Sequence, residues 1–271
     1  MNRCVICGNQ GPFKDKYPEI HIVECPTCGH VFLGRQLNDA DIKEIYSPGY
    51  FKGEHNQYSD YEKDRHILQR NFRGRVKEIL KHKKCGKLLE IGSAYGYFLE
   101  LVKNYFDVTG FEICKEAADF ARDNFGVDVR NEDFLRAEIS ERFDVVCMFD
   151  VIEHLKEPDL YIEKIGGLTD PGSLLFVTTG DISALLPRIQ GRKWRLMVPP
   201  FHIHYFNPRN VSLLLDRYGF EVERIHYPGI WRSLHQAFSS LFNWKSASRF
   251  IPGAFYINTF DIMEIRARKK K

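Results

Sequence analysis

Residues 88–96 read LLEIGSAYG, and this stretch decides the fold. The apolar residues on both sides of Glu90 predict a short buried strand. The small residues after it predict a tight turn, and they are Gly92, Ala94 and Gly96. Small residues let the backbone come close to a bound molecule. A strand, such a turn and a following helix therefore predict a nucleotide-binding loop.

The chain from residue 87 onward alternates short apolar runs with helical stretches. Strands are expected at 87–91, 108–112, 128–130, 144–149, 174–179, 222–226 and 262–267. Helices are expected between them, at 97–105, 115–125, 160–168 and 208–218. This alternation is typical of βαβ units. The sequence therefore predicts an α/β fold with a doubly wound, Rossmann-like sheet of seven strands, mostly parallel, with the last strand antiparallel.

Length and composition limit the class of protein. The 271 residues are 44% hydrophobic, which is enough for one main core with a small appendage. The 39 basic and 36 acidic residues give a formal net charge of +3, a balance that argues against a dedicated nucleic-acid binder. The sequence shows neither an apolar run of about 18 residues nor the pattern of a signal peptide. We therefore expect a cytoplasmic protein without a membrane span.

Glu112 comes twenty residues after Gly92, at the end of the next predicted strand. An acidic side chain at this place can accept hydrogen bonds from two ribose hydroxyl groups. A dinucleotide would also need a pyrophosphate cradle at the loop, where the carboxylate of Glu90 would repel it. The loop therefore argues against a dinucleotide.

Five segments resemble, in order, the motifs of class I S-adenosylmethionine-dependent methyltransferases. They are residues 88–96, 108–121 (VTGFEICKEAADFA), 131–134 (NEDF), 143–155 (FDVVCMFDVIEHL) and 170–175 (DPGSLL). The first motif of that family is acidic-x-Gly-x-Gly-x-Gly. Glu90, Gly92 and Gly96 match it, whereas Ala94 replaces the middle glycine.

The resemblance implies S-adenosylmethionine as the cofactor and assigns its parts to particular residues. The methionine part would face residues 92–96, and the ribose would lie at Glu112. Asp133 and Phe134 would contact the adenine, and Asp150 would line the same pocket.

Two CxxC pairs lie near the start of the chain. Cys4 and Cys7 form the first pair, and Cys25 and Cys28 form the second, with 17 residues between the pairs. This spacing is typical of a four-cysteine tetrahedral zinc site. A glycine follows each pair and permits the turn that directs backbone N–H groups toward the thiolates. Four thiolates leave no coordination position open, so we expect a structural Zn²⁺ ion.

The sequence predicts three parts, a zinc-binding module at 1–35, a helical connector at 36–84 and a methyltransferase domain at 85–271. Helices are expected within the connector at 37–46 and 60–84. Residues 180–207 are too many for an ordinary connection and are expected to form a lid or binding segment. Its cations, Arg188, Arg192, Lys193 and Arg195, could hold an anionic group of the acceptor, and a solvated basic face explains them equally well.

The block at 201–225 (FHIHYFNPRNVSLLLDRYGFEVERI) resembles a bacterial subgroup of small-molecule methyltransferases, several of which carry a similar N-terminal cysteine module. The resemblance implies a small-molecule acceptor, linked to a sugar or glycan, that is methylated on oxygen. Methyl transfer to a hydroxyl needs a base near its proton. His154, after the fourth strand, and His204, in the expected lid, are the candidate catalytic residues, because histidine titrates near neutral pH.

Two alternatives remain open at this point. An RNA methyltransferase would use the zinc module to bind RNA and would carry a basic face from that module to the pocket. A non-catalytic scaffold would keep the cofactor loop but lack a usable base in its pocket.

Overall fold

A seven-stranded sheet forms the centre of the computed structural model, which describes residues 3–35, 37, 61–233 and 253–271. Its strands, in spatial order, are β10 (Phe220–His226), β13 (Ile262–Lys269), β8 (Thr169–Gly180), β7 (Phe143–Phe149), β4 (Lys87–Ile91), β5 (Asp107–Phe111) and β6 (Asp128–Arg130). Neighbours from β8 to β6 are parallel, whereas β13 is antiparallel to both of its neighbours. The predicted α/β fold, with its antiparallel last strand, is confirmed.

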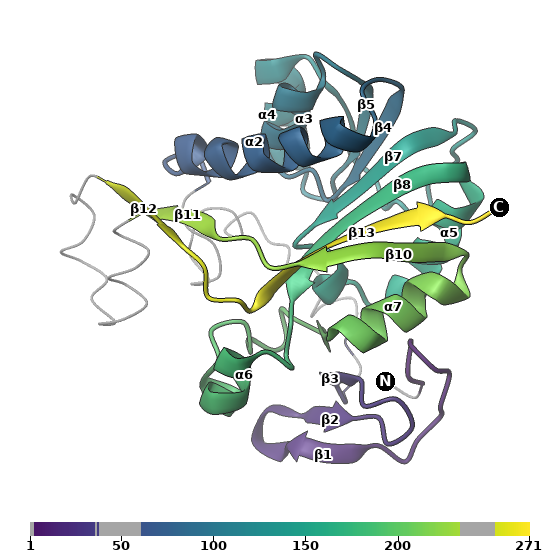
Figure 1. Cartoon of the computed structure of the whole chain (residues 1–271), viewed down its shortest axis with the longest axis vertical. Coiled ribbons are helices and arrows are strands. Elements are labelled where there is room, and N and C mark those ends of the chain that lie inside the picture. Colours follow the sequence, from purple (N-terminus) through teal and green to yellow (C-terminus); the bar gives the residue numbers. More distant parts are fainter. Residues whose placement is uncertain (1–2, 36, 38–60, 234–252) are drawn as a thin grey trace.

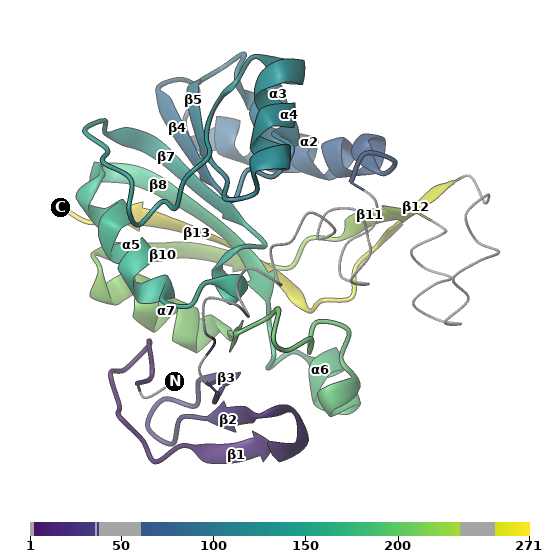
Figure 2. The ribbon, with the colours of Figure 1, turned by 180° about the vertical axis from the view of Figure 1, so that it is seen from behind.

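Helices cover both faces of this sheet (Figures 1 and 2). One face carries α2 (Arg65–His82), α3 (Tyr97–Val102) and α4 (Lys115–Phe125), and the other carries α5 (Pro158–Gly167) and α7 (Pro208–Arg217). Successive strand residues point to opposite faces, so the adjacent residues Leu88 and Leu89 belong to two different cores. Because both faces of the sheet are covered, strands in its middle, such as β7 and β8, contain continuous apolar runs.

A second sheet contains four strands in the order β1-β2-β3-β9. Three come from the N-terminal part, β1 (Lys14–Tyr17), β2 (Ile22–Glu24) and β3 (Val31–Leu33), and the fourth is β9 (His204–Tyr205). In the last pair Val31 lies opposite Tyr205 and Phe32 opposite His204. The sequence did not predict these strands, because two to four residues are too few to show a period. Residues 3–35 are thus joined by strand pairing to the segment that precedes α7.

The segment after β8 contains the short helix α6 (Leu185–Gln190) and the 3₁₀ turn η4 (Gly191–Lys193). The strands β11 (Ile230–Ser233) and β12 (Ala254–Ile257) pair beside α2, where the Asn71 side chain bonds both the N–H and the carbonyl of Trp231. The helix expected at 37–46 lies, apart from Leu37, outside the described residues. None of the helices in the described part of the chain is both long and apolar enough to cross a membrane.

Candidate active site

The turn after β4 has a left-handed backbone at three positions, with φ of 73° at Gly92, 45° at Ala94 and 72° at Gly96. A Cβ atom on Gly92 would lie 2.5 Å from Cγ2 of Val151, and one on Gly96 would lie 2.7 Å from Cβ of Ala121. Both positions therefore need glycine for space as well as for backbone conformation. Ala94 adopts the same region at the cost of some strain, a feature that is concentrated at functional sites.

Glu112 lies directly against this turn. Its Oε2 accepts a hydrogen bond of 2.8 Å from the N–H of Ala94, and its Oε1 accepts one of 2.8 Å from the N–H of Cys114. Burial raises the pKa of Glu112, and these backbone N–H groups oppose that rise. Each carboxylate oxygen can accept a second hydrogen bond. The structure thus places Glu112, the residue predicted to bind the ribose, directly against the glycine turn.

Asp133 and Phe134 follow β6 on the same edge of the sheet. Oδ1 of Asp133 accepts hydrogen bonds from the N–H of Leu135 at 3.0 Å and from the hydroxyl of Tyr161 at 3.1 Å. The buried ring of Phe134 meets the ring of Phe111 edge-on, with centroids 5.4 Å apart. Asp133 keeps 39% of its side chain exposed, so it can still accept a hydrogen bond from a ligand.

Asp150, the residue after β7, is held in a strained position by Arg75. Its φ is 58°, and its Oδ1 accepts a hydrogen bond of 2.9 Å from the hydroxyl of Thr178. Nη2 of Arg75, on α2, donates to Oδ2 of Asp150 at 3.3 Å and to Oγ1 of Thr178 at 3.3 Å. Nε of Arg75 lies 3.8 Å from Glu264. The sequence did not single out Arg75, because nothing in the helical pattern distinguishes it from the other arginines of α2.

Glu90 lies beneath this arginine, on the face of the sheet that α2 covers. Burial raises its pKa well above the ordinary value, Arg75 lowers it, and Glu112 raises it further. Its Oε2 has no hydrogen-bond partner among the described residues, and the same holds for the buried Oγ of Ser93 in the turn. Two buried acceptors without partners beside a left-handed turn fit a ligand that brings its own donors, such as an ammonium group.

We expect Arg75→Gln to lower the free energy of unfolding by about 3 kcal/mol, because it removes the cation that lies against the buried Glu264 and hydrogen-bonds Asp150. Urea denaturation followed by circular dichroism measures this. Arg73→Gln, an exposed arginine on the same helix, is the matched control and should have no measurable effect. Equal effects of the two substitutions would show that Arg75 does not neutralise these carboxylates.

Three buried side chains meet just past β7. Glu153 and His154 belong to the 3₁₀ turn η3 (Ile152–His154), and His202 comes from the chain before β9. The two imidazole rings meet edge-to-face, with centroids 4.6 Å apart. Burial, together with Asp150, raises the pKa of Glu153 to about 8, and burial lowers the pKa of His154 to about 4. Sequence reasoning chose His154 as a catalytic residue and neither of its two neighbours, although His202 lies in the expected lid and Glu153 in the same quoted motif.

His204, the second predicted catalytic residue, lies in β9, the fourth strand of the sheet that β1, β2 and β3 begin. Its Nδ1 is 3.0 Å from Nε2 of His30, and both rings are fully buried. Burial lowers the pKa of His204 to about 3 and that of His30 well below the ordinary range, so both rings are neutral. The structure therefore places His204 in the four-stranded sheet against His30, whereas His154 contacts His202.

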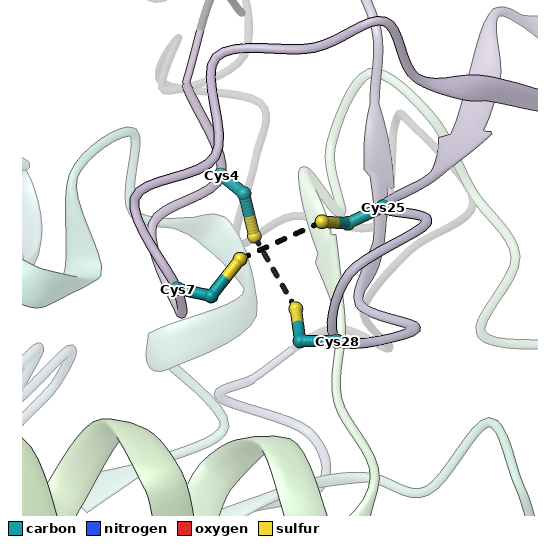
Figure 3. Close-up of side chains that lie close together, drawn as sticks. All are labelled: Cys4, Cys7, Cys25 and Cys28. Carbon is teal, nitrogen blue, oxygen red and sulfur yellow. Dashed lines mark hydrogen bonds between the residues drawn. The ribbon is translucent and has the colours of Figure 1, made fainter.

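The four predicted metal ligands converge, and their sulfur atoms point toward one another (Figure 3). Sγ of Cys4 lies 3.6 Å from Sγ of Cys28, and Sγ of Cys7 lies 3.6 Å from Sγ of Cys25. Thiolates bound to one ion at about 2.3 Å in a tetrahedron lie about 3.8 Å apart. Burial would raise the pKa of Cys25, but backbone N–H groups and neighbouring sulfurs lower it to about 7. The group can hold a metal ion.

The four cations of the expected binding segment fall into two groups. Arg188, Arg192 and Lys193 are exposed on α6 and η4, and Arg192 lies 3.5 Å from Glu19. Arg195 instead donates a hydrogen bond of 2.7 Å to the fully buried Asp261. Most of this charge is therefore a solvated surface, and Arg195 is engaged by a carboxylate of the chain itself.

Known proteins resemble this chain over the same region. A family model described as a methyltransferase domain matches residues 64–225. A probable S-adenosylmethionine-dependent methyltransferase of Mycolicibacterium smegmatis is 29% identical over 152 residues, which are 55% of this chain and 57% of that protein. A ubiquinone biosynthesis O-methyltransferase of Actinobacillus pleuropneumoniae is 28% identical over 134 residues, which are 44% of this chain and 57% of that protein. The matches thus span little more than half the length of these relatives.

Solved structures share the fold. Magnesium protoporphyrin IX methyltransferase from Synechocystis, with SAH bound, has a TM-score of 0.58 at 15% identity and covers 86% of this chain and 100% of its own. An S-adenosylmethionine-dependent methyltransferase from Archaeoglobus fulgidus has a TM-score of 0.56 at 18% identity, and the match covers 82% of this chain and 100% of that protein. At identities this low, the likeness concerns only the fold, that is, the arrangement of the sheet and its helices.

Proposed function

Because the chain belongs to the family of methyltransferase domains, which its residues 64–225 match, we propose that it transfers a methyl group from S-adenosylmethionine to a small-molecule acceptor. The observation that carries the proposal is the contact of Glu112 with the left-handed turn, at 2.8 Å from the N–H of Ala94. This contact lies at the carboxyl ends of parallel strands, where ligands of open α/β sheets bind.

The residues around the turn would bind and orient the cofactor. When bound, S-adenosylmethionine supplies a methyl group on a positively charged sulfur. Gly92, Ala94 and Gly96 would face its methionine part, and Glu90 would accept a hydrogen bond from its ammonium group. Glu112 would accept hydrogen bonds from the ribose. The remaining contacts proposed are those of Asp133 and Phe134 with the adenine and of Asp150 with the same pocket.

We place the acceptor at Glu153, His154 and His202, because these polar side chains are buried beside Asp150 at the carboxyl edge of β7. Oxygen is the proposed methyl acceptor, which agrees with the O-methyltransferases among the relatives. A sugar-linked acceptor follows from the resemblance of residues 201–225, and an anionic one from the cations of residues 180–207. Both remain part of the proposal. His154 would take part in removing the hydroxyl proton, whereas His204 would hold β9 in place through its bond to His30.

We expect His154→Ala to lower kcat about 100-fold, because the hydroxyl proton then has no side chain to assist its removal. The assay follows label from S-adenosylmethionine into a panel of nucleotide sugars, glycan fragments and RNA. His66→Ala, an exposed histidine on α2, is the matched control and should retain full activity. Label in RNA alone would contradict a small-molecule acceptor. Cofactor binding without transfer to any member of the panel would favour a non-catalytic scaffold.

Zinc is the metal proposed for the four cysteines, with a structural role, because four thiolates fill a tetrahedral site. Residues 1–35 would then form a zinc-binding module, 36–84 a helical connector and 85–271 the catalytic domain, to which β9 ties the module. The cytoplasm is the proposed location, since a reducing compartment keeps the thiols available to the metal.

A further inference from the structure

Glu153, His154 and His202 form a second group of possible metal ligands, apart from the four cysteines. One donor atom of each lies within 4.8 Å of the donor atoms of the other two. The three residues are only 5%, 7% and 8% exposed. They come from two segments far apart in the sequence, η3 and the chain before β9. Polar side chains of this kind seldom gather in a buried place unless they bond one another or a ligand.

Hydrogen bonds to carbonyl groups orient both imidazole rings. Nδ1 of His154 lies 2.9 Å from the carbonyl oxygen of Phe201, and Nδ1 of His202 lies 2.8 Å from that of Leu196. A carbonyl oxygen only accepts, so in both rings Nδ1 carries the proton and Nε2 carries the lone pair. An Nδ1–H that donates to a backbone carbonyl is the usual support of a histidine that binds metal through Nε2.

The carboxyl group of Glu153 is incompletely satisfied. Its Oε2 is buried and has no hydrogen-bond partner among the described residues. Such an oxygen costs free energy, because it has lost its contacts with water and gained none with the protein. A cation beside it would remove this cost. Glu153 is also hydrogen-bonded to Thr179, so only its Oε2 lacks a partner. This oxygen and the orientation of the two imidazoles are independent observations, and both point to the space between the three side chains.

We propose that Glu153, His154 and His202 bind one divalent transition-metal ion, such as Zn²⁺. Two imidazole nitrogens and one carboxylate oxygen are the ligand set of open zinc sites, in which a fourth position is left to water or substrate. Ligand atoms about 2.1 Å from a tetrahedral ion lie about 3.4 Å apart. The donor atoms lie within 4.8 Å of one another, so they would have to approach by up to about 1.4 Å to bind one ion.

The role of this ion rests on the proposed function. Its open position would take the hydroxyl oxygen of the acceptor, and the ion would lower the pKa of that hydroxyl as it does for bound water. The proton leaves to a water molecule, and the oxygen attacks the methyl carbon. The carbon–sulfur bond breaks with its electron pair going to sulfur, which yields a methyl ether and S-adenosylhomocysteine. His154 then acts as a ligand of the ion and not as the proton acceptor.

Metal content of the full-length protein tests the site without any assay of activity. Purified protein is loaded with Zn²⁺, freed of excess ion by gel filtration and analysed for zinc per chain. We expect two equivalents for the wild type and for His66→Ala, and one equivalent for His202→Ala. Glu153→Gln keeps the volume of the side chain, so a correctly folded protein should result. Its affinity for the second ion should fall at least roughly 100-fold.

Cobalt distinguishes the two sites, because Co²⁺ bound to thiolates absorbs in the near ultraviolet and Co²⁺ bound to nitrogen and oxygen does not. The second equivalent of Co²⁺ should therefore add visible bands alone, and His202→Ala should lose these bands while it keeps the thiolate absorption. A wild-type protein that binds a single equivalent, or a His202→Ala protein that keeps two, would overturn the site. If such a protein still transferred methyl groups, the metal site would be wrong and the proposed function would be supported. A second ion in a protein that transfers no methyl group to any acceptor would support the site and count against the proposed function.

Discussion

Gly92→Arg lowers the affinity for S-adenosylmethionine by about 1,000-fold or more, a loss of ~4 kcal/mol, if the turn after β4 is the cofactor site. The Cβ atom alone would lie 2.5 Å from Cγ2 of Val151, and φ at this position is 73°. An arginine therefore strains the backbone, displaces Val151 and fills the space where the turn would meet the ligand. Isothermal titration calorimetry with S-adenosylmethionine measures the effect.

The matched control is Gly167→Arg, at the end of α5. A Cβ atom there meets nothing within 4 Å, and the residue is exposed. This variant should bind the cofactor as the wild type does. Thermal unfolding of both variants separates loss of the site from loss of the fold. A folded Gly92→Arg protein with near-normal affinity would show that the cofactor binds elsewhere.

Cys25→Ser should release the zinc ion proposed for the four cysteines and unfold residues 3–35. Zinc bound to small peptides contributes about 10–16 kcal/mol, which is comparable with the stability of a whole domain. The other supports of the module include the pairing of β3 with β9, the ion pair of Arg3 with Asp159 at 2.5 Å and the bond from Asn210 to the carbonyl of Cys28 at 2.9 Å. Zinc analysis and hydrogen exchange of β1, β2 and β3 measure the two effects.

Cys85→Ser provides the comparison for this experiment, because Cys85 is exposed and lies outside the cluster. It should leave both the zinc content and the exchange rates unchanged. A Cys25→Ser protein that keeps its zinc would contradict the four-thiolate site. Zinc loss with undisturbed exchange in β3 would show that pairing with β9 alone holds the module.

The central sheet was predictable because its signals are local. The strands β7 and β8 contain continuous apolar runs, and helices such as α4 show their period over ten or more residues. The four-stranded sheet was not predictable, since β9 has two residues and gains its stability from β3, which is remote in the sequence. Pairing over such a separation leaves no local pattern to recognise.

The candidate site also contains residues that could be predicted from the sequence and residues that could not. Glu112 and the glycine turn could be paired from the sequence, because a fixed spacing along consecutive strands brings them together. Arg75 could not be identified, since its role depends on how α2 crosses the sheet above Asp150. His202 was one histidine among several near the expected lid, and only the fold places it against His154. Side chains that meet across segments without a fixed spacing lie beyond what one sequence reveals.

The strand pairing of β3 with β9 also constrains the order of events during synthesis. The four cysteines leave the ribosome early, whereas β9 follows after most of the chain, roughly 10 to 30 s later at usual rates of translation. During this interval β3 carries Val31, Phe32 and Leu33 on an open edge that the finished protein buries. The nascent chain would therefore gain from capturing the proposed zinc ion early, because an ordered module exposes less of this edge to other chains.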